Sequence, residues 1–329
     1  DKLEDNMWGY NRTVDQKVNI GSAFLQNEWK NDHWGFLIGG RLDKHNLIDH
    51  VIFSPRANLR YNPTENINLR FSYSSGFRAP QAFDEDLHVE NVGGNVAMVE
   101  LADNLKEERS QSLSASADIY HRFGAFQVNF LVEGFYTKLS DVFALTDGEV
   151  VDGILTRTRH NASGAQVMGL TLEGKMAYLN KIQVQAGVTL QQSHYSKPHI
   201  WNKEAPAVKK MMRTPNTYGY FTATYTPIKP LSIALSGTYT GSMLVPHEPV
   251  PGFLENPITV NTKDFFDIGL KAAYDFKLYK SMNLQVNAGI QNIFNAYQDD
   301  FDKGADRDSG YIYGPSLPRS FFAGVKISY

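Results

Sequence analysis

The sequence predicts an all-β protein, a transmembrane antiparallel β-barrel, and three observations point to this class. The last stretch alternates with period two, which is typical of a strand with one apolar face. That face carries Phe321, Ala323, Val325, Ile327 and Tyr329. The same alternation recurs in about thirteen segments, many of them longer than the roughly 9–11 residues that cross a bilayer. Short turns alternate with longer loops, as they do in outer-membrane barrels.

Composition excludes several other classes. The chain has 329 residues and a net charge of −3, and no basic stretch stands out, which argues against nucleic acid as a partner. It has no cysteine, so disulfides and thiolate metal sites are excluded. No apolar run approaches the roughly 20 residues of a membrane helix, whereas barrel strands expose only alternate residues to lipid.

The predicted strands follow one another from a first hairpin to the end of the chain. Trp29 and Trp34 flank the first tight turn, as aromatic residues do at a membrane surface. The clearest alternation starts at Ile182, where aliphatic residues alternate mainly with glutamine. The strands are expected near residues 18–31, 33–45, 51–61, 66–79, 107–122, 125–145, 155–179, 182 to about 195, 217–227, 231–243, 264–278, 282–296 and 317–329.

Polar or unpatterned segments are expected to be loops. They cover residues 1–17, 81–106, 146–154, 196–214, 244–263 and 297–316. If the last strand ends in the periplasm, these loops are extracellular, and residues 1–17 are the remnant of an extracellular loop. An odd number of strands does not close a bacterial barrel of this kind. Residues 1–329 are therefore expected to form the C-terminal part of a larger barrel, whose other strands are a separate chain, were cleaved or lie outside this sequence.

A soluble β-sandwich or β-helix is the alternative fold. A sandwich would also place glutamine, asparagine, threonine and serine opposite the apolar rows, but it rarely needs strands this long. A polar lumen accounts for both features.

Short motifs run almost from end to end of the chain. The most specific are Gly76–Pro80 (Gly-Phe-Arg-Ala-Pro), Asn292–Asn295 (Asn-Ile-Phe-Asn) and the Pro318-Arg319 pair before the final strand. Gln26–Glu28, Gly40–Asp43, Ser54–Arg56, Arg213–Asn216 and Gly314–Leu317 accompany them. In this order they resemble the C-terminal barrel region of TonB-dependent outer-membrane receptors, of a Bacteroidetes type.

Three positions depart from the pattern of that family. Leu105–Glu108 reads Leu-Lys-Glu-Glu where Leu-Lys-Pro-Glu is usual, and Gly169–Thr171 reads Gly-Leu-Thr where Gly-x-Glu is usual. The last residue is Tyr329 where phenylalanine is commoner. These changes concern strand chemistry and leave the resemblance intact.

The resemblance implies a 22-stranded barrel in which these strands are numbers ten to twenty-two. It implies an N-terminal plug, absent from these residues, through which TonB, ExbB and ExbD drive import across the outer membrane. The partners are then outer-membrane lipid, the remaining strands and plug, and a small-molecule ligand. That ligand is expected to be an iron or other metal complex, a siderophore or haem, or else a corrinoid; no intrinsic cofactor is expected.

Strand charges are expected to face inward. A charge facing lipid at mid-depth costs about 2–4 kcal/mol. Arg41, Asp43, Arg56 and Arg78 should therefore line the lumen and pair with each other or with the plug. Arg78, at the base of the longest loop, is also a candidate for contact with the ligand.

Loop residues supply the other candidates. Asp84, Glu85, Asp86 and His88 could collect a cation, although acidic loop residues more often only face solvent. His199 and His247 could serve as axial ligands of haem, and Trp201 could add an apolar wall. Residues 299–308 resemble a calcium loop that lacks its terminal glutamate, so loop-bound calcium is a further expectation.

Two other functions remain open at this stage. A passive outer-membrane channel closed from these strands alone would conduct without energy. A barrel enzyme would need a nucleophile, a histidine and an acid, and no spacing in the sequence singles out such a set.

Overall fold

The computed structural model describes residues 2–7, 12–80, 96–151, 154–279, 281–315 and 317–329. The described residues form strands and no helix, and so no helix that could span a membrane. The strands are β1 (Lys2–Met7), β2 (Arg12–Lys17), β3 (Ile20–Lys30), β4 (Trp34–His45), β5 (Val51–Thr64), β6 (Ile67–Arg78), β7 (Val96–Leu101), β8 (Glu108–Phe123), β9 (Phe126–Ser140), β10 (Phe143–Val151), β11 (Ile154–Asn161), β12 (Ala165–Tyr178), β13 (Ile182–His199), β14 (Val208–Lys210), β15 (Thr217–Ile228), β16 (Leu231–Thr240), β17 (Leu244–His247), β18 (Ile258–Asn261), β19 (Phe265–Tyr279), β20 (Met282–Gln291) and β21 (Ser320–Ser328).

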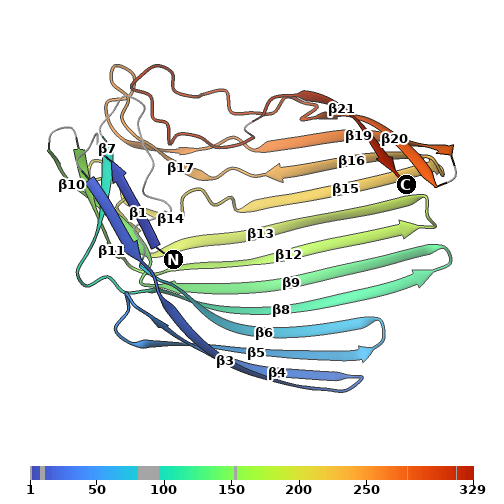
Figure 1. Cartoon of the computed structure of the whole chain (residues 1–329), viewed down its shortest axis with the longest axis horizontal. Coiled ribbons are helices and arrows are strands. Elements are labelled where there is room, and N and C mark those ends of the chain that lie inside the picture. The colour runs from blue at the N-terminus through green and yellow to red at the C-terminus, as the bar shows by residue number, and fades with distance from the viewer. Residues whose placement is uncertain (1, 8–11, 81–95, 152–153, 280, 316) are drawn as a thin grey trace.

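One large sheet dominates the molecule (Figure 1). Within the described residues its path has thirteen strands, in the order β21-β20-β19-β16-β15-β13-β12-β9-β8-β6-β5-β4-β3, and β14 pairs with β13 beside the path. Neighbours along the path run antiparallel. The predicted fold class and the thirteen predicted barrel strands are confirmed. The path is open, with β3 and β21 at its two ends.

The two ends of the sheet differ in character. At one end the strands turn back within two or three residues, and at the other they continue into longer segments (Figure 1). The β8–β9 turn is the tightest kind, because Phe123 pairs with Phe126. Gly124 adopts a φ of 60° there, a left-handed conformation that glycine reaches without a steric penalty. We call the end of the sheet with the short turns the turn end, and the end with the longer segments the loop end.

The loop end holds strands that the alternation did not predict. The expected strand 155–179 is two strands, β11 and β12, and the expected strand 125–145 stops at Ser140. Asp141 lies between β9 and β10 with a φ of 55°, which redirects the chain out of the main sheet. Strand β10 pairs with β11, which pairs in parallel with β7. The expected loop at 1–17 holds the β1–β2 hairpin, and β17 pairs with β18 in the expected loop at 244–263.

The two faces of the main sheet carry different side chains. Residues directly opposite one another in an antiparallel ladder share a face. One such outward row is Phe36, Leu59, Phe71, Ala115, Gly134, Leu170 and Leu190. An inward row is Arg60, Arg70, Ser116, Glu133, Thr171 and Thr189. The outward row is apolar and its large side chains are exposed, as expected for a wall that meets lipid.

This division predicts different costs for a charge on the two faces. Ala115 points outward, and the next residue, Ser116, points inward opposite Glu133. We expect Ala115→Arg to destabilise the protein in lipid by about 2–4 kcal/mol. Ser116→Arg should cost less than about 1 kcal/mol, because its guanidinium can pair with Glu133. Urea-induced unfolding in phospholipid vesicles measures both, and equal costs would contradict the assignment of the faces.

Candidate functional site

The inner wall of the sheet is a network of polar side chains. Glu173 accepts a hydrogen bond from the Tyr220 hydroxyl. It also forms an ion pair with Lys175, whose ammonium nitrogen lies 2.7 Å from a carboxylate oxygen. Gln185 donates to the Tyr220 hydroxyl at 2.7 Å. Lys175 and Gln185 also line a hollow of about 340 Å³ on this wall, together with Tyr120. The wall therefore satisfies much of its own polarity, and a ligand crossing it would meet hydroxyl, amide and charged groups.

The charges predicted to face inward do pair near the edge strand β3. The Arg41 Nε donates to both carboxylate oxygens of Asp43, at 2.8 and 2.9 Å. Ser22 donates to the same carboxylate at 2.6 Å. Asp43 is only 1% exposed, so this pairing compensates for the burial of its charge. The predicted pairing of Arg41 with Asp43 is confirmed.

Arg78 lies at the base of the loop end. One of its guanidinium nitrogens lies 3.6 Å from a carboxylate oxygen of Glu108. The guanidinium lies 5.5 Å from the ring centroid of Phe143, and that of Arg159 lies 5.7 Å from the same ring. Two cations on one aromatic ring anchor β10 and β11 against the main sheet. Arg78 is about half exposed, so it also faces the space above the wall.

Glu107 marks a second contact at the loop base. Its side chain is buried, accepts a hydrogen bond from the Arg109 Nε at 2.8 Å and lies 3.0 Å from the His50 Nε2. Burial alone would raise the pKa of Glu107, but the bonds to Arg109 and His50 outweigh it and lower that pKa. Glu107 therefore ties the start of β8 to the segment before β5.

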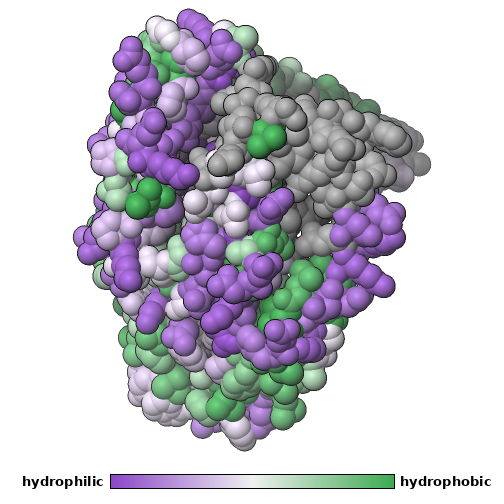
Figure 2. All heavy atoms as spheres, turned by 90° about the vertical axis from the view of Figure 1, so that its left-hand side faces the viewer, coloured by the Kyte–Doolittle hydropathy of each residue, from purple (hydrophilic) through white to green (hydrophobic). Residues whose placement is uncertain are grey.

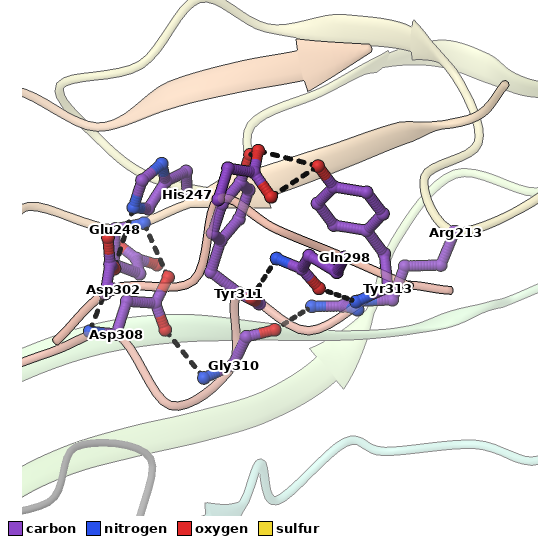
Figure 3. Close-up of polar contacts among 10 residues, drawn as sticks. Arg213, His247, Glu248, Gln298, Asp302, Asp308, Gly310, Tyr311 and Tyr313 are labelled. Atoms are coloured by element: carbon purple, nitrogen blue, oxygen red, sulfur yellow. Dashed lines mark hydrogen bonds and ion pairs between the residues drawn. The ribbon is translucent and has the colours of Figure 1, made fainter. Parts of the chain in front are cut away.

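The loop end is largely hydrophilic where it faces the viewer in Figure 2, with hydrophobic residues gathered toward the lower part of that view. Three connecting segments meet there: residues 200–216, 241–264 and 292–319. Beneath them lies a small apolar core formed by Val245, Phe265, Tyr311 and Tyr313. We call the polar contacts around this core the loop cluster; its residues are Arg213, His247, Glu248, Gln298, Asp300, Asp302, Asp308, Gly310, Tyr311 and Tyr313 (Figure 3).

Asp300 joins the two tyrosines of the loop cluster. The hydroxyls of Tyr311 and Tyr313 both donate to its carboxylate, at 2.9 and 2.6 Å. Burial, followed by this hydrogen bond, raises the pKa of Tyr311 to about 12 and raises that of Tyr313 as well. Partial burial would raise the pKa of Asp300, but the bonds from the two hydroxyls outweigh it and lower that pKa. The three groups therefore stay as one carboxylate and two neutral phenols at neutral pH.

His247 and Asp302 form a buried pair within the loop cluster. The His247 Nε2 lies 2.8 Å from the Asp302 Oδ2, and both side chains are less than a tenth exposed. The imidazole stacks on Tyr311, with ring centroids 3.8 Å apart. The backbone N–H of Asp308 also donates to Asp302, and Asp308 accepts from the backbone N–H of Glu248 (Figure 3). These contacts bind the segment after β16 to the segment after β20.

Arg213 closes the loop cluster from the third segment. It adopts a φ of 56° and donates through its guanidinium to the carbonyl oxygens of Gly310 and Ile312, at 2.5 and 2.9 Å. The partners are 97 and 99 residues further along the chain. The Arg-Thr-Pro-Asn motif therefore fastens the segment before β15 to the segment before β21.

The Asn-Ile-Phe-Asn motif reverses the chain after β20. Asn292 and Asn295 both have left-handed φ values, 49° and 56°, which asparagine tolerates better than most residues. The buried Asn292 side chain donates to the carbonyl oxygens of Ala296 and Leu317. Asn295 accepts from the backbone N–H of Arg319. The motif holds the start of the last long loop against its end.

The predicted ligand residues have different surroundings. His199 ends β13, is half-buried and lies with its ring centroid 4.6 Å from that of Tyr195. Trp201 follows it, and its indole N–H is buried without a hydrogen-bond partner. His247 is instead engaged by Asp302. The sequence indicated that His247 lies on a loop, but it did not indicate its partner Asp302, because no short-range pattern links residues 55 positions apart.

The predicted metal residues Asp84, Glu85, Asp86 and His88 lie outside the described residues. Among the described residues, no group of three or more histidine, aspartate or glutamate side chains is arranged to hold a metal ion. Within the segment expected to resemble a calcium loop, Asp300, Asp302 and Asp308 accept hydrogen bonds from the protein, and Asp299 pairs with Lys263 at 2.9 Å. Calcium binding there stays a prediction.

The loop cluster makes a testable prediction about Asp302. Asp302→Ala should destabilise the protein by about 2–4 kcal/mol, because it leaves the His247 Nε2 and the Asp308 N–H buried without an acceptor. Asp299→Ala, at an exposed ion pair of the same loop, should cost less than about 1 kcal/mol. Hydrogen exchange of residues 297–313 measures the local loss of protection. Equal protection in both variants would show that the cluster does not hold the loop.

Comparison with solved structures finds the same fold in several iron receptors. A mutant of the ferric enterobactin receptor PfeA from Pseudomonas aeruginosa is 17% identical, with a TM-score of 0.64 over 96% of this chain and 45% of that one. The ferric-catecholate import receptor Fiu of E. coli K12 is 16% identical, with a TM-score of 0.66 over 96% and 45%. The FrpB iron transporter from Neisseria meningitidis is 18% identical, with a TM-score of 0.64 over 94% and 45%. The chain thus spans a little under half the length of these structures.

No curated protein sequence matches the chain. A family model does match it over residues 4–293, and that model describes the β-barrel of TonB-dependent receptor-like proteins. The match covers most of the chain and includes the β3–β20 part of the main sheet. The family and the solved structures with this fold are transport receptors rather than enzymes. The chain belongs to the TonB-dependent receptor β-barrel family.

Proposed function

We propose that this chain forms part of an outer-membrane receptor that imports a metal complex with energy delivered through TonB. It would supply the C-terminal strands of a 22-stranded barrel and the loops that first meet the ligand. One observation carries the proposal: a polar inner wall opens at one end into three segments that are bonded into a single cluster. The turn end would face the periplasm and the loop end the exterior, so that β1 and β2 belong to an extracellular loop.

The ligand we propose is a ferric complex of the siderophore type. The solved structures that share the fold are named for ferric enterobactin, ferric catecholates and iron. The inner wall also suits such a cargo, because its lysine, hydroxyl and amide groups can donate hydrogen bonds to the oxygens of an anionic chelate. Haem and corrinoids are the alternatives that binding assays would separate.

His199 and Trp201 are the described residues that best fit contact with this ligand. The indole N–H of Trp201 is buried without an acceptor, and an unsatisfied donor of this kind costs about 1–3 kcal/mol. A ligand oxygen would satisfy it once the side chains around Trp201 move apart to admit the ligand. His247 fits a supporting role, because Asp302 occupies its Nε2. Arg78, Asp84, Glu85, Asp86 and His88 complete the proposed contacts at the long loop, with the acidic residues and His88 as a second point for a cation.

A passive channel closed from these strands alone fits the geometry less well. Closure would require β3 to pair with β21, and these are the two ends of the open path. An unpaired strand edge in lipid leaves its N–H and C=O groups without partners, each at a cost of several kcal/mol. The open edges favour further strands between β21 and β3.

The proposed contact of Trp201 can be tested by substitution in the complete receptor. Trp201→Phe keeps an aromatic ring but removes the N–H donor, and should weaken binding of ferric enterobactin about tenfold. Trp34→Phe, a matched change at the turn end, should leave binding unchanged. Fluorescence quenching of the purified receptor gives the dissociation constants. Unchanged affinity of Trp201→Phe would remove this residue from the site.

Energised import has a separate test. A strain that depends on this receptor should grow on ferric enterobactin as its iron source, and deletion of TonB should abolish that growth while leaving surface binding intact. Uptake that persists without TonB would instead identify a passive channel. Growth on haem or a corrinoid but not on ferric siderophores would retain the import mechanism and change the ligand.

A further inference from the structure

A row of basic and amide side chains crosses the outward face of the sheet near the loop end. The registers place Gln111 opposite Lys138, Lys138 opposite Gln166, Gln166 opposite His194 and His194 opposite Lys210. Residues directly opposite one another share a face, so all five side chains lie on one surface across β8, β9, β12, β13 and β14. This set is called the outer basic row.

The outer basic row borders the apolar part of the outward face. Two residues closer to the turn end on the same strands, the outward side chains are Leu113, Tyr136, Met168 and Gln192. The outward row nearer mid-strand is Ala115, Gly134, Leu170 and Leu190. The Tyr136 hydroxyl donates to Gln166 at 3.4 Å, so the tyrosine spans the boundary with its ring on the apolar side. On β8, β9 and β12 the side chains change from apolar or aromatic to amide or basic between two successive outward positions.

The basic side chains of this row have no acidic partner in the part of the chain that the structure describes. Within the described residues, Lys138, His194 and Lys210 have neither an ion pair nor a side-chain hydrogen bond, and the row itself contains no carboxylate. The next outward pair toward the loop end is Arg109 and Ser140, and Arg109 is itself paired with Glu107. On the inner wall, by contrast, Lys175 pairs with Glu173.

We propose that the outer basic row binds the phosphate group of an anionic lipid in the membrane leaflet at the loop end. Lys138 and Lys210 would neutralise the phosphate, and Gln166 and His194 would donate hydrogen bonds to its oxygens. Strands lie roughly 4.8 Å apart, so Lys138 and His194 are about 10 Å apart at the backbone and Lys210 is about 5 Å further. Flexible lysine side chains span such distances and reach from an apolar surface into the headgroup layer.

The position of the outer basic row favours a lipid phosphate over a free anion as its ligand. The row lies on the surface that faces lipid, directly beyond exposed aromatic and aliphatic side chains that would contact the acyl chains. A lipid phosphate is held at that level by its own acyl chains, whereas a free phosphate loses its translational freedom on binding. The inference rests on the proposed placement of the sheet in a membrane, but it does not depend on which ligand is imported.

The test uses the complete receptor in nanodiscs of phosphatidylcholine with and without phosphatidic acid. Native mass spectrometry counts the lipids that the receptor retains on release. The native protein should retain phosphatidic acid in preference to phosphatidylcholine. Lys138→Gln with Lys210→Gln should weaken retention of phosphatidic acid more than tenfold, because both lysine charges near the membrane surface are removed.

A matched control uses the turn end. Lys181→Gln with Lys229→Gln removes the same charge from exposed turns and should leave retention unchanged. Equal loss in both double variants, no preference for phosphatidic acid, or displacement of the lipid by inorganic phosphate would each overturn the proposal. Ferric enterobactin binding is measured in parallel on the same samples. Loss of lipid retention with intact ligand binding separates this inference from the proposed function.

Discussion

The backbone ladder of the main sheet is the constraint on which the rest of the structure depends. In lipid, each N–H and C=O group must find a partner within the protein, and antiparallel strands provide one along nearly their whole length. Fixing the ladder also fixes the register, and the register decides which side chain meets lipid and which meets the interior. Ala115 and Ser116 are neighbours in sequence but belong to opposite environments for this reason.

At the loop end the backbone polar groups are not paired by the ladder. Its segments leave the ladder, so their polar groups must be paired by side chains and short bridges. Asp302 accepts bonds from His247 and from the backbone of Asp308, and Arg213 donates to two carbonyl groups nearly a hundred residues away. Tyr311 and Tyr313 combine an apolar ring in the small core with a hydroxyl on Asp300. The opening is shaped by a bonded framework, and the proposed contacts at His199 and Trp201 lie where β13 leads into one of its segments.

Much of the sheet could be predicted from the sequence, because period-two alternation is a local signal that reports directly on the two faces. Inward pairing of Arg41 with Asp43 followed from the cost of a charge in lipid. The strands of the loop end could not be found in this way. Strand β7 pairs in parallel with β11 some sixty residues later, and no short window shows such a partner. The same holds for His247, whose position was visible in the sequence but whose bond to Asp302 depends on two separate loops.

The sheet is a meander in which every strand of the path pairs with the preceding one, so its contacts can form hairpin by hairpin. The bonds of Arg213 to Gly310 and Ile312 span β15, β16, β19 and β20, and we expect them to form after these strands have paired. Closing so long a loop has a cost in conformational entropy. That cost falls once the strands between its two ends have paired, because they bring the ends together. During biogenesis, the loop cluster would therefore take its shape only after the wall beneath it is built, and a protein stalled midway in assembly would lack this framework.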